Sequence, residues 1–132
     1  MLKQAEFLEK HGLVDLGYDI IILDDCYSEK QRNKKGEMVA DPVKFPQGLQ
    51  YLSGQVNEHG VSLAAYNDAG YYTCAGYPGS YGHEKQDLEV RLYLSAVLLD
   101  HCSPLSQTFA SWGMKYLKVG QSSGFHPSHQ AC

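Results

Sequence analysis

The stretch from Tyr18 to Tyr27, YDIIILDDCY, constrains the fold more than any other part of the chain. It holds a run of branched apolar side chains, Ile20 to Leu23, that ends abruptly in two carboxylates and a cysteine. An apolar run without polar alternation fits a strand buried on both faces, as in a parallel sheet covered by helices. Because α/β folds place their ligands at the carboxyl ends of strands, we expect Asp24 and Asp25 to be site residues.

The length and charge of the chain exclude several classes of protein. The 132 residues allow one ordinary domain but fall short of the roughly 250 residues of a complete (β/α)8 barrel. A net charge of -4, with no basic cluster longer than Lys34-Lys35, argues against a nucleic-acid partner. No stretch approaches about 18 uninterrupted apolar residues, and the segment MLKQAEFLEKHG lacks the apolar core of a signal peptide. We therefore expect no membrane association and no export signal within this chain.

Cysteine and tyrosine usage bear on the kind of ligand. The four cysteines, at positions 26, 74, 102 and 132, lack the CxxC spacing of a zinc site, so we expect neither a metal nor another cofactor. Four of the ten tyrosines fall within residues 71–81. Such a ring-lined, hydroxyl-rich stretch suits a sugar ligand, but it also occurs in ordinary tyrosine-rich loops.

The remaining sequence predicts an alternation of helices and strands. Apolar residues at helical spacing precede Gly12 and Gly17, and a second amphipathic helix follows Pro46 and ends at His59-Gly60. Polar or glycine-rich loops are expected at 28–41 and 71–82, a buried strand at 61–66, a helical region from 83 to 113 and a third strand at 114–119. With right-handed crossovers, this order predicts a parallel α/β sheet or barrel whose polar strand ends share one edge.

Five segments carry a family resemblance. In order along the chain they are LDDCY, FPQGLQYL, AAYNDAG, TCAGYPGSYGHEKQD and TFASWGMKYLK. Together they resemble the α-galactosidase (melibiase) family of retaining glycoside hydrolases, from Ala5 to Lys118 with one interruption. The resemblance implies an α/β fold, a fragment of a (β/α)8 TIM barrel spanning about strands 2 to 4. It also implies a secreted hydrolase of terminal non-reducing α-D-galactose residues, acting on galactose-containing oligosaccharides or glycoconjugates.

The resemblance also implies roles for individual residues. Asp24 and Asp25 would bind hydroxyls of the galactose, the Tyr66 ring would line the pocket floor, Cys74 would be a further pocket residue, and Lys118 would donate to a hydroxyl. Chemistry agrees for the acidic pair, because neighbouring positions on a strand project to opposite sides and cannot flank one glycosidic bond. A carboxylate can also accept hydrogen bonds from several hydroxyls. Taken singly, the same residues have simpler explanations. Asp24 and Asp25 could cap the following helix or loop, Tyr66 could be a core ring, and Lys118 could be a solvated lysine.

The chain departs from the family at the catalytic position. The family nucleophile is the aspartate two residues after the lysine, in a Lys-Tyr-Asp-Asn motif, whereas here Gly120 occupies that position. Glycine has no nucleophilic atom, so no covalent galactosyl intermediate can form there. The family's acid/base aspartate would lie beyond Cys132. We therefore expect no catalytic residue in this chain and no hydrolysis by it.

A second departure interrupts the family pattern. Residues 90–107 (VRLYLSAVLLDHCSPLSQ) stand between Glu89 and Thr108, and removing them would restore a continuous helix, QDLE-TFASWG. The expected organisation is a partial catalytic barrel over 1–118, interrupted at 90–107, followed by a non-family tail over 119–132. Both breaks begin with valine and the first ends in glutamine, as translated introns can. The rival explanation is a genuine insertion that extends a barrel helix.

The family's disulfides are also affected. By resemblance, Cys26 pairs with a cysteine upstream of Met1, and Cys74 pairs with a cysteine whose position here holds Ser122. Loss of a native disulfide typically costs about 2–5 kcal/mol, so we expect a marginally stable chain.

Three other functions remain open. A response-regulator receiver also has an acidic pair after its first strand, but Asp68 comes one strand too early for its phosphoacceptor. A non-catalytic galactose-binding fragment, or an inert one, fits the surviving pocket residues. Specificity for α-N-acetylgalactosamine is equally compatible, because the loop that reads the second substituent of the sugar lies downstream.

Overall fold

A three-stranded parallel sheet forms the centre of the computed structural model, which describes residues 1–88 and 108–121. The strands are β1 (Ile20–Leu23), β2 (Ser62–Asp68) and β3 (Tyr116–Gly120), in the spatial order β1-β2-β3. Both pairings are parallel, with Leu23 opposite Ala65 and Tyr66 opposite Lys118. The predicted α/β class and parallel order are confirmed, although β2 continues through the two polar residues that were expected to follow it.

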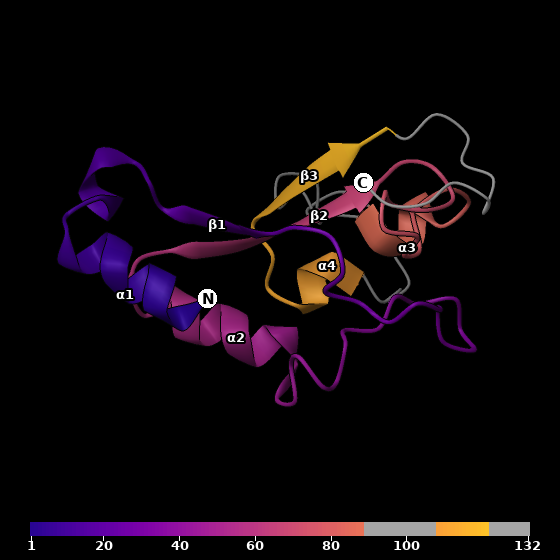
Figure 1. Ribbon diagram of the computed structural model, residues 1–132, viewed down its shortest axis with the longest axis horizontal. Helices are drawn as coiled ribbons and strands as arrows, with labels where there is room; N and C mark the ends of the chain where they lie inside the picture. Colours follow the sequence, from indigo (N-terminus) through magenta and orange to yellow (C-terminus); the bar gives the residue numbers. More distant parts are fainter. Residues whose placement is uncertain (89–107, 122–132) are drawn as a thin grey trace, which may run out of the picture.

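The helices lie where apolar spacing predicted them. They are α1 (Leu2–Lys10), the short 3-10 helix η1 (Val14–Leu16), α2 (Gly48–Asn57), α3 (Glu84–Leu88) and α4 (Thr108–Ser111). Figure 1 shows α1, α2 and α4 on one side of the sheet, with α3 near the carboxyl ends of the strands. Gly17 adopts a left-handed backbone with φ 90°, which ends η1 just before β1. Within the described ranges, no helix has both the length and the apolarity needed to cross a bilayer.

Alternate residues of the strands build the core on the helix-covered side of the sheet. Leu23 and Leu63 pack there against Leu49 of α2 and Phe109 of α4. A smaller cluster joins Ala5 of α1 to Val56 and Val61, which fixes α1 against α2. The period-2 alternation of strands explains why this face takes the odd-numbered residues and leaves the even-numbered ones for the opposite face.

The opposite face of the sheet corrects one expectation from the sequence. Ile20 and Ile22 of β1 are 46% and 37% exposed, so β1 is not buried on both faces as predicted. The strand forms an edge of the sheet, and only one of its faces meets helices in the described part of the chain. The central strand β2 behaves as expected, since Ala64 and Tyr66 on the same open face are buried.

The ends of α3 and α4 meet although 19 residues separate Leu88 from Thr108 in the sequence. The Thr108 hydroxyl donates to the carbonyl oxygen of Gln86 at 3.5 Å. If residues 90–107 were absent, Thr108 would follow Gln86 by four positions, the spacing at which a helical threonine bonds the preceding turn. The two short helices therefore lie in contact at these residues. The interrupting segment itself lies outside the described residues.

Candidate functional site

Three of the predicted site residues form a row across the carboxyl edge of the sheet. Asp24 follows β1 directly, and Tyr66 and Lys118 are register partners on β2 and β3. The Lys118 Nζ lies 2.9 Å from Asp24 Oδ2 and 5.0 Å from the centroid of the Tyr66 ring. A carboxylate, an ammonium group and an aromatic ring thus stand together, a combination that can bind polyhydroxylated ligands.

Neighbouring groups shift the pKa values of two side chains in this row. The hydrogen bond from Lys118, followed by one from the Asp25 backbone N–H, holds the pKa of Asp24 below its ordinary range. Burial, and then the charge of Asp68, raises the pKa of the Tyr66 hydroxyl. Both side chains of the Asp24–Lys118 pair remain largely exposed, at 68% and 49%. Each side chain can therefore give up the ion pair and form hydrogen bonds with ligand hydroxyls instead.

Acidification should break this pair. Because the pKa of folded Asp24 is lower than its unfolded value, the stabilisation is complete above about pH 4 and is lost as pH falls through the lowered pKa. An NMR titration of the Asp24 carboxyl carbon should give a midpoint below 3.8. Lys118→Ala should raise that midpoint toward the ordinary value, with the Asp25 N–H still lowering it; an unchanged midpoint would show that the pair does not form.

The second predicted acid, Asp25, has different surroundings. Its carboxylate accepts hydrogen bonds from the Thr73 hydroxyl at 2.8 Å and from the backbone N–H of Ala75 at 3.0 Å. These two residues flank Cys74, which is exposed and whose thiol lies close enough to Tyr66 to raise the pKa of its hydroxyl. All five predicted binding positions are therefore gathered at this edge. Cys26 and Cys74 are both free in the described part of the chain.

Position 120 faces the same space. A Cβ added to Gly120 would lie 2.9 Å from the Tyr66 hydroxyl oxygen and 2.9 Å from Asp68 Oδ2. Asp68, which is 1% exposed and pairs in register with Gly120, was not among the predicted binding residues. Its position at the polar end of β2 was the signal in the sequence that pointed to it. A buried carboxylate therefore already borders position 120.

A buried polar network fixes the loops around this edge. The Arg32 guanidinium donates to both carboxylate oxygens of Asp87, at 2.9 and 2.5 Å, and to the carbonyl oxygen of Gly79 at 2.7 Å. Ser80 donates to Asp87 at 2.9 Å and accepts from Asn67 of β2 at 2.6 Å. The network ties the loop after β1, the glycine-rich loop and α3 to the central strand. Periodicity gave no indication of it, because Arg32 lies in an irregular polar loop.

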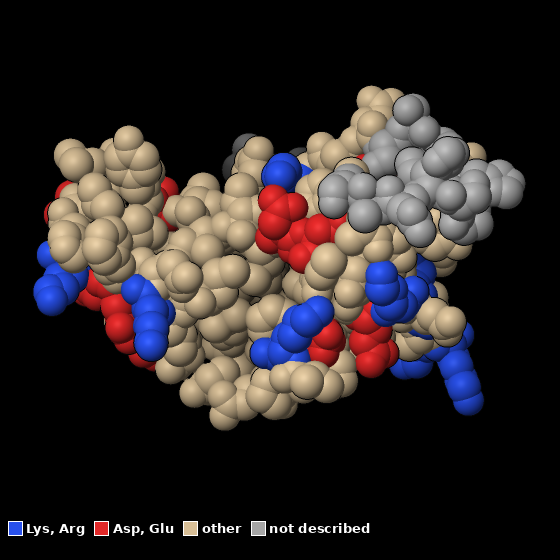
Figure 2. Space-filling view, viewed as in Figure 1, with Lys and Arg blue, Asp and Glu red and all other residues tan. Residues whose placement is uncertain are grey.

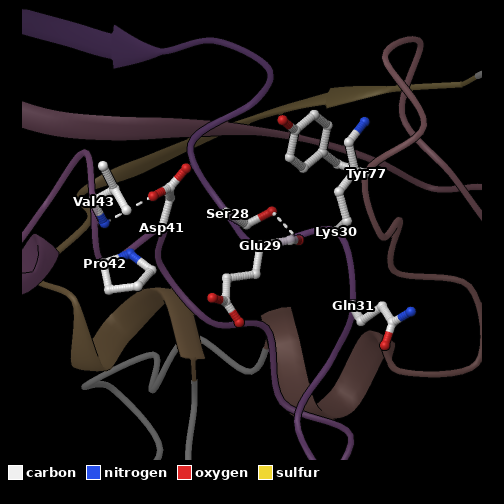
Figure 3. Close-up of a pocket in the computed structure, with 8 residues that line it drawn as sticks. All are labelled: Ser28, Glu29, Lys30, Gln31, Asp41, Pro42, Val43 and Tyr77. Carbon is white, nitrogen blue, oxygen red and sulfur yellow. Dashed lines mark hydrogen bonds between the residues drawn. The ribbon is translucent and has the colours of Figure 1, made fainter.

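An open pocket of about 410 Å³ lies on the outer side of the same loops. Figure 3 shows its walls, with residues 28–31 facing residues 41–43 and the Lys30 side chain reaching the Tyr77 ring. The Lys30 Nζ lies 3.9 Å from the centroid of that ring. Acidic and basic side chains are interspersed on the face seen in Figure 2, without a large patch of one sign. Among the described residues, no three His, Cys, Asp or Glu side chains are grouped to hold a metal ion.

Comparison with known proteins identifies the family of this chain. A family model described as alpha galactosidase A matches residues 1–130. The chain belongs to the α-galactosidase family. It is 38% identical over 119 residues to an α-galactosidase of Schizosaccharomyces pombe and 36% identical over 117 residues to human α-galactosidase A, covering 89% of this chain in each case. The chain spans 23% of the length of each of these curated relatives.

Solved structures of the family superpose on the fragment. The α-galactosidase of Saccharomyces cerevisiae with raffinose matches 91% of this chain and 22% of its own, with a TM-score of 0.72 and 36% identity. A putative α-galactosidase from Bacteroides fragilis matches 98% of this chain and 23% of its own, with a TM-score of 0.75 and 32% identity. The predicted fold, a fragment of the family's (β/α)8 barrel, is confirmed.

Proposed function

We propose that the protein represented by this chain hydrolyses terminal α-D-galactose residues, and that the chain supplies part of the galactose pocket. The row formed by Asp24, Tyr66 and Lys118 carries the proposal, because it joins an exposed carboxylate, a ring and an ammonium group at one edge. The family relationship supports it, as does a structural relative solved with raffinose, an α-galactoside. Secretion and a carbohydrate partner follow from the family and belong to the same proposal.

The pocket assignment is tested by titrating galactose into the chain by calorimetry. Asp24 and Lys118 present groups to hydroxyls, but three strands enclose little of a hexose, so we expect binding no tighter than millimolar. Asp24→Asn should abolish any heat of binding, whereas Glu6→Gln on the exposed surface of α1 should leave it unchanged. If the Asp24 variant bound galactose as tightly as the wild type, Asp24 would not be a ligand of the sugar.

The chain itself should show no hydrolysis of an aryl α-galactoside. Retaining glycosidases need two carboxylates about 5–5.5 Å apart, and the nucleophile position is Gly120. Turnover by the wild-type chain that Asp25→Ala abolished would overturn this expectation.

Restoring the carboxylate alone should fail. Gly120→Asp should give no turnover and should lower the free energy of unfolding by about 1–3 kcal/mol, because the new side chain overpacks against Tyr66 and Asp68. Gly120→Ala controls for the added Cβ without the charge. Urea denaturation and the aryl-galactoside assay measure the two effects. An active or more stable aspartate variant would show that the space at position 120 is open.

We also propose that residues 90–107 interrupt an otherwise complete barrel helix. The hydrogen bond from Thr108 to Gln86 supports this, since it joins two residues that would lie four positions apart in the uninterrupted helix. Sequencing the mature transcript across the codons for Glu89 and Thr108 tests whether the segment is a translated intron. Its presence in the dominant message would leave the genuine insertion as the explanation.

A further inference from the structure

We infer that Tyr71 and Tyr81 form a second carbohydrate site, an aromatic platform that binds neutral sugar rings of a substrate beyond its terminal galactose. The substrate would then be an oligosaccharide or polysaccharide with α-galactose branches rather than a small galactoside. The statement about the substrate rests on the proposed function. The platform itself rests on the two rings and on the loop that carries them.

The two rings are paired and yet largely exposed. Their centroids lie 4.4 Å apart, with an angle of 46° between the ring planes. Tyr71 and Tyr81 nevertheless remain 62% and 54% exposed, because the contact between the rings covers only one side of each. The Tyr71 hydroxyl also forms a hydrogen bond with Tyr81, which raises the pKa of Tyr71. The pair is therefore one unit that presents free aromatic faces to solvent.

Exposed tyrosines have the chemistry that a neutral sugar ring requires. The C–H groups on one face of a pyranose pack against the negatively polarised face of an aromatic ring, and the phenol hydroxyls can bond the sugar hydroxyls. Within residues 1–88 and 108–121, the ammonium groups placed over aromatic rings lie at Tyr66 and Tyr77 and not at this pair. The nearby charge is acidic, since Glu84 accepts from the Gly82 N–H at 3.0 Å. These charges favour a neutral ligand over an anionic one.

The loop that carries the rings holds them in place before a ligand arrives. The Tyr81 N–H donates to the carbonyl oxygen of Gly70 at 3.1 Å, and the Gly79 N–H donates to that of Tyr71 at 2.8 Å. The two arms of the loop approach so closely that a Cβ at position 79 would overlap with the Gly70 carbonyl oxygen. Because the backbone is fixed, binding has to order only the side chains, and tyrosine has few torsions to lose.

The same loop joins the platform to the edge where the galactose pocket is proposed. Asp68 Oδ1 accepts from the Gly70 N–H at 2.7 Å, and Asp68 Oδ2 borders position 120. Tyr71 follows Asp68 by three positions, so their Cα atoms are at most about 11 Å apart. Figure 1 shows the loop between β2 and α3 beside the carboxyl ends of the strands. An oligosaccharide whose terminal galactose lies at this edge can therefore extend to the platform.

NMR titration of the chain, with isotope-labelled tyrosine, tests the platform with two matched probes. One probe is mannopentaose, and the other is mannopentaose that carries a single α-galactosyl branch. We expect both probes to shift the ring signals of Tyr71 and Tyr81. Tyr71→Ala and Tyr81→Ala should each weaken the binding of both probes about tenfold, which corresponds to about 1.4 kcal/mol. Tyr51→Ala, at a tyrosine of α2 that is 49% exposed, should leave binding unchanged.

Two further variants separate the platform from the pocket. Tyr71→Phe keeps the ring, so it should bind mannopentaose more tightly than Tyr71→Ala does. Asp24→Asn should weaken the binding of the branched probe only, because the other probe has no galactose. The inference is overturned if mannopentaose does not bind, or if it binds Tyr71→Ala as tightly as the wild type. If Asp24→Asn leaves the branched probe unaffected while Tyr71→Ala weakens both, the pocket proposal fails and the platform stands.

Discussion

Replacing Asp87 by alanine should lower the free energy of unfolding by about 3–5 kcal/mol, the typical cost of removing one partner of a buried ion pair. The Asp87 side chain is fully buried and that of Arg32 is 11% exposed, so the guanidinium would be left in the interior without its counter-charge. Ser80 would lose its acceptor as well. Urea denaturation followed by circular dichroism measures the loss. In a chain of this size it would remove most of the folded population.

The matched control is Glu9→Ala, which removes an acid from the exposed pair with His59. That change should cost less than about 1 kcal/mol. The double variant Arg32→Ala/Asp87→Ala should be more stable than Asp87→Ala, because it leaves no buried charge unpaired. Equal losses for Asp87→Ala and Glu9→Ala would mean that the network does not hold the loops.

Deleting residues 90–107 should raise the free energy of unfolding by about 2–6 kcal/mol. Helices as short as α3 and α4, with five and four residues, are marginal because each helix end leaves up to four backbone groups without an intrahelical partner. Joining Glu89 to Thr108 would pair about four of these groups, at about 0.5–1.5 kcal/mol for each hydrogen bond. Thermal unfolding of the shortened and full-length chains, followed by circular dichroism, compares them directly.

A deletion that is one residue shorter provides the control. Deleting only 90–106 adds one residue to the joined helix and rotates everything after it by about 100°. Phe109 would then turn away from the core cluster that it shares with Leu49 and Leu63. That variant should be less stable than the chain lacking 90–107. If both deletions destabilise the protein equally, the segment is a genuine part of the fold.

The sequence was sufficient to predict the parallel sheet because the apolar strands and the helical spacing act locally. The prediction that both faces of β1 are buried was wrong, because the burial of Ile20 and Ile22 depends on whether other elements cover the open face. An apolar run shows that a strand can be buried, but not which of its faces is. The interruption of one helix by residues 90–107 stays a prediction from the sequence, and the contact between Thr108 and Gln86 is what supports it.

The sequence predicted residues that the structure gathers at one edge, but not the different contacts that each of them makes. Asp24 and Asp25 are identical in type and adjacent, so only the donors around each carboxylate distinguish them. Those donors, Ala75 and Lys118, lie 50 and 94 positions away in the sequence. Arg32 escaped notice as a supporting residue for the same reason, because the network around Asp87 joins four separate segments.

The bond between Asp24 and Lys118 links residues 94 positions apart and crosses over β2, which lies between their strands. It can form only after β3 has docked, because closing so long a segment comes late compared with local helix formation. During synthesis the acidic residues and Tyr66 would leave the ribosome well before the lysine. A nascent chain ending before β3 would therefore lack the bond between Asp24 and Lys118. Formation of this bond would report that all three strands have joined into one sheet.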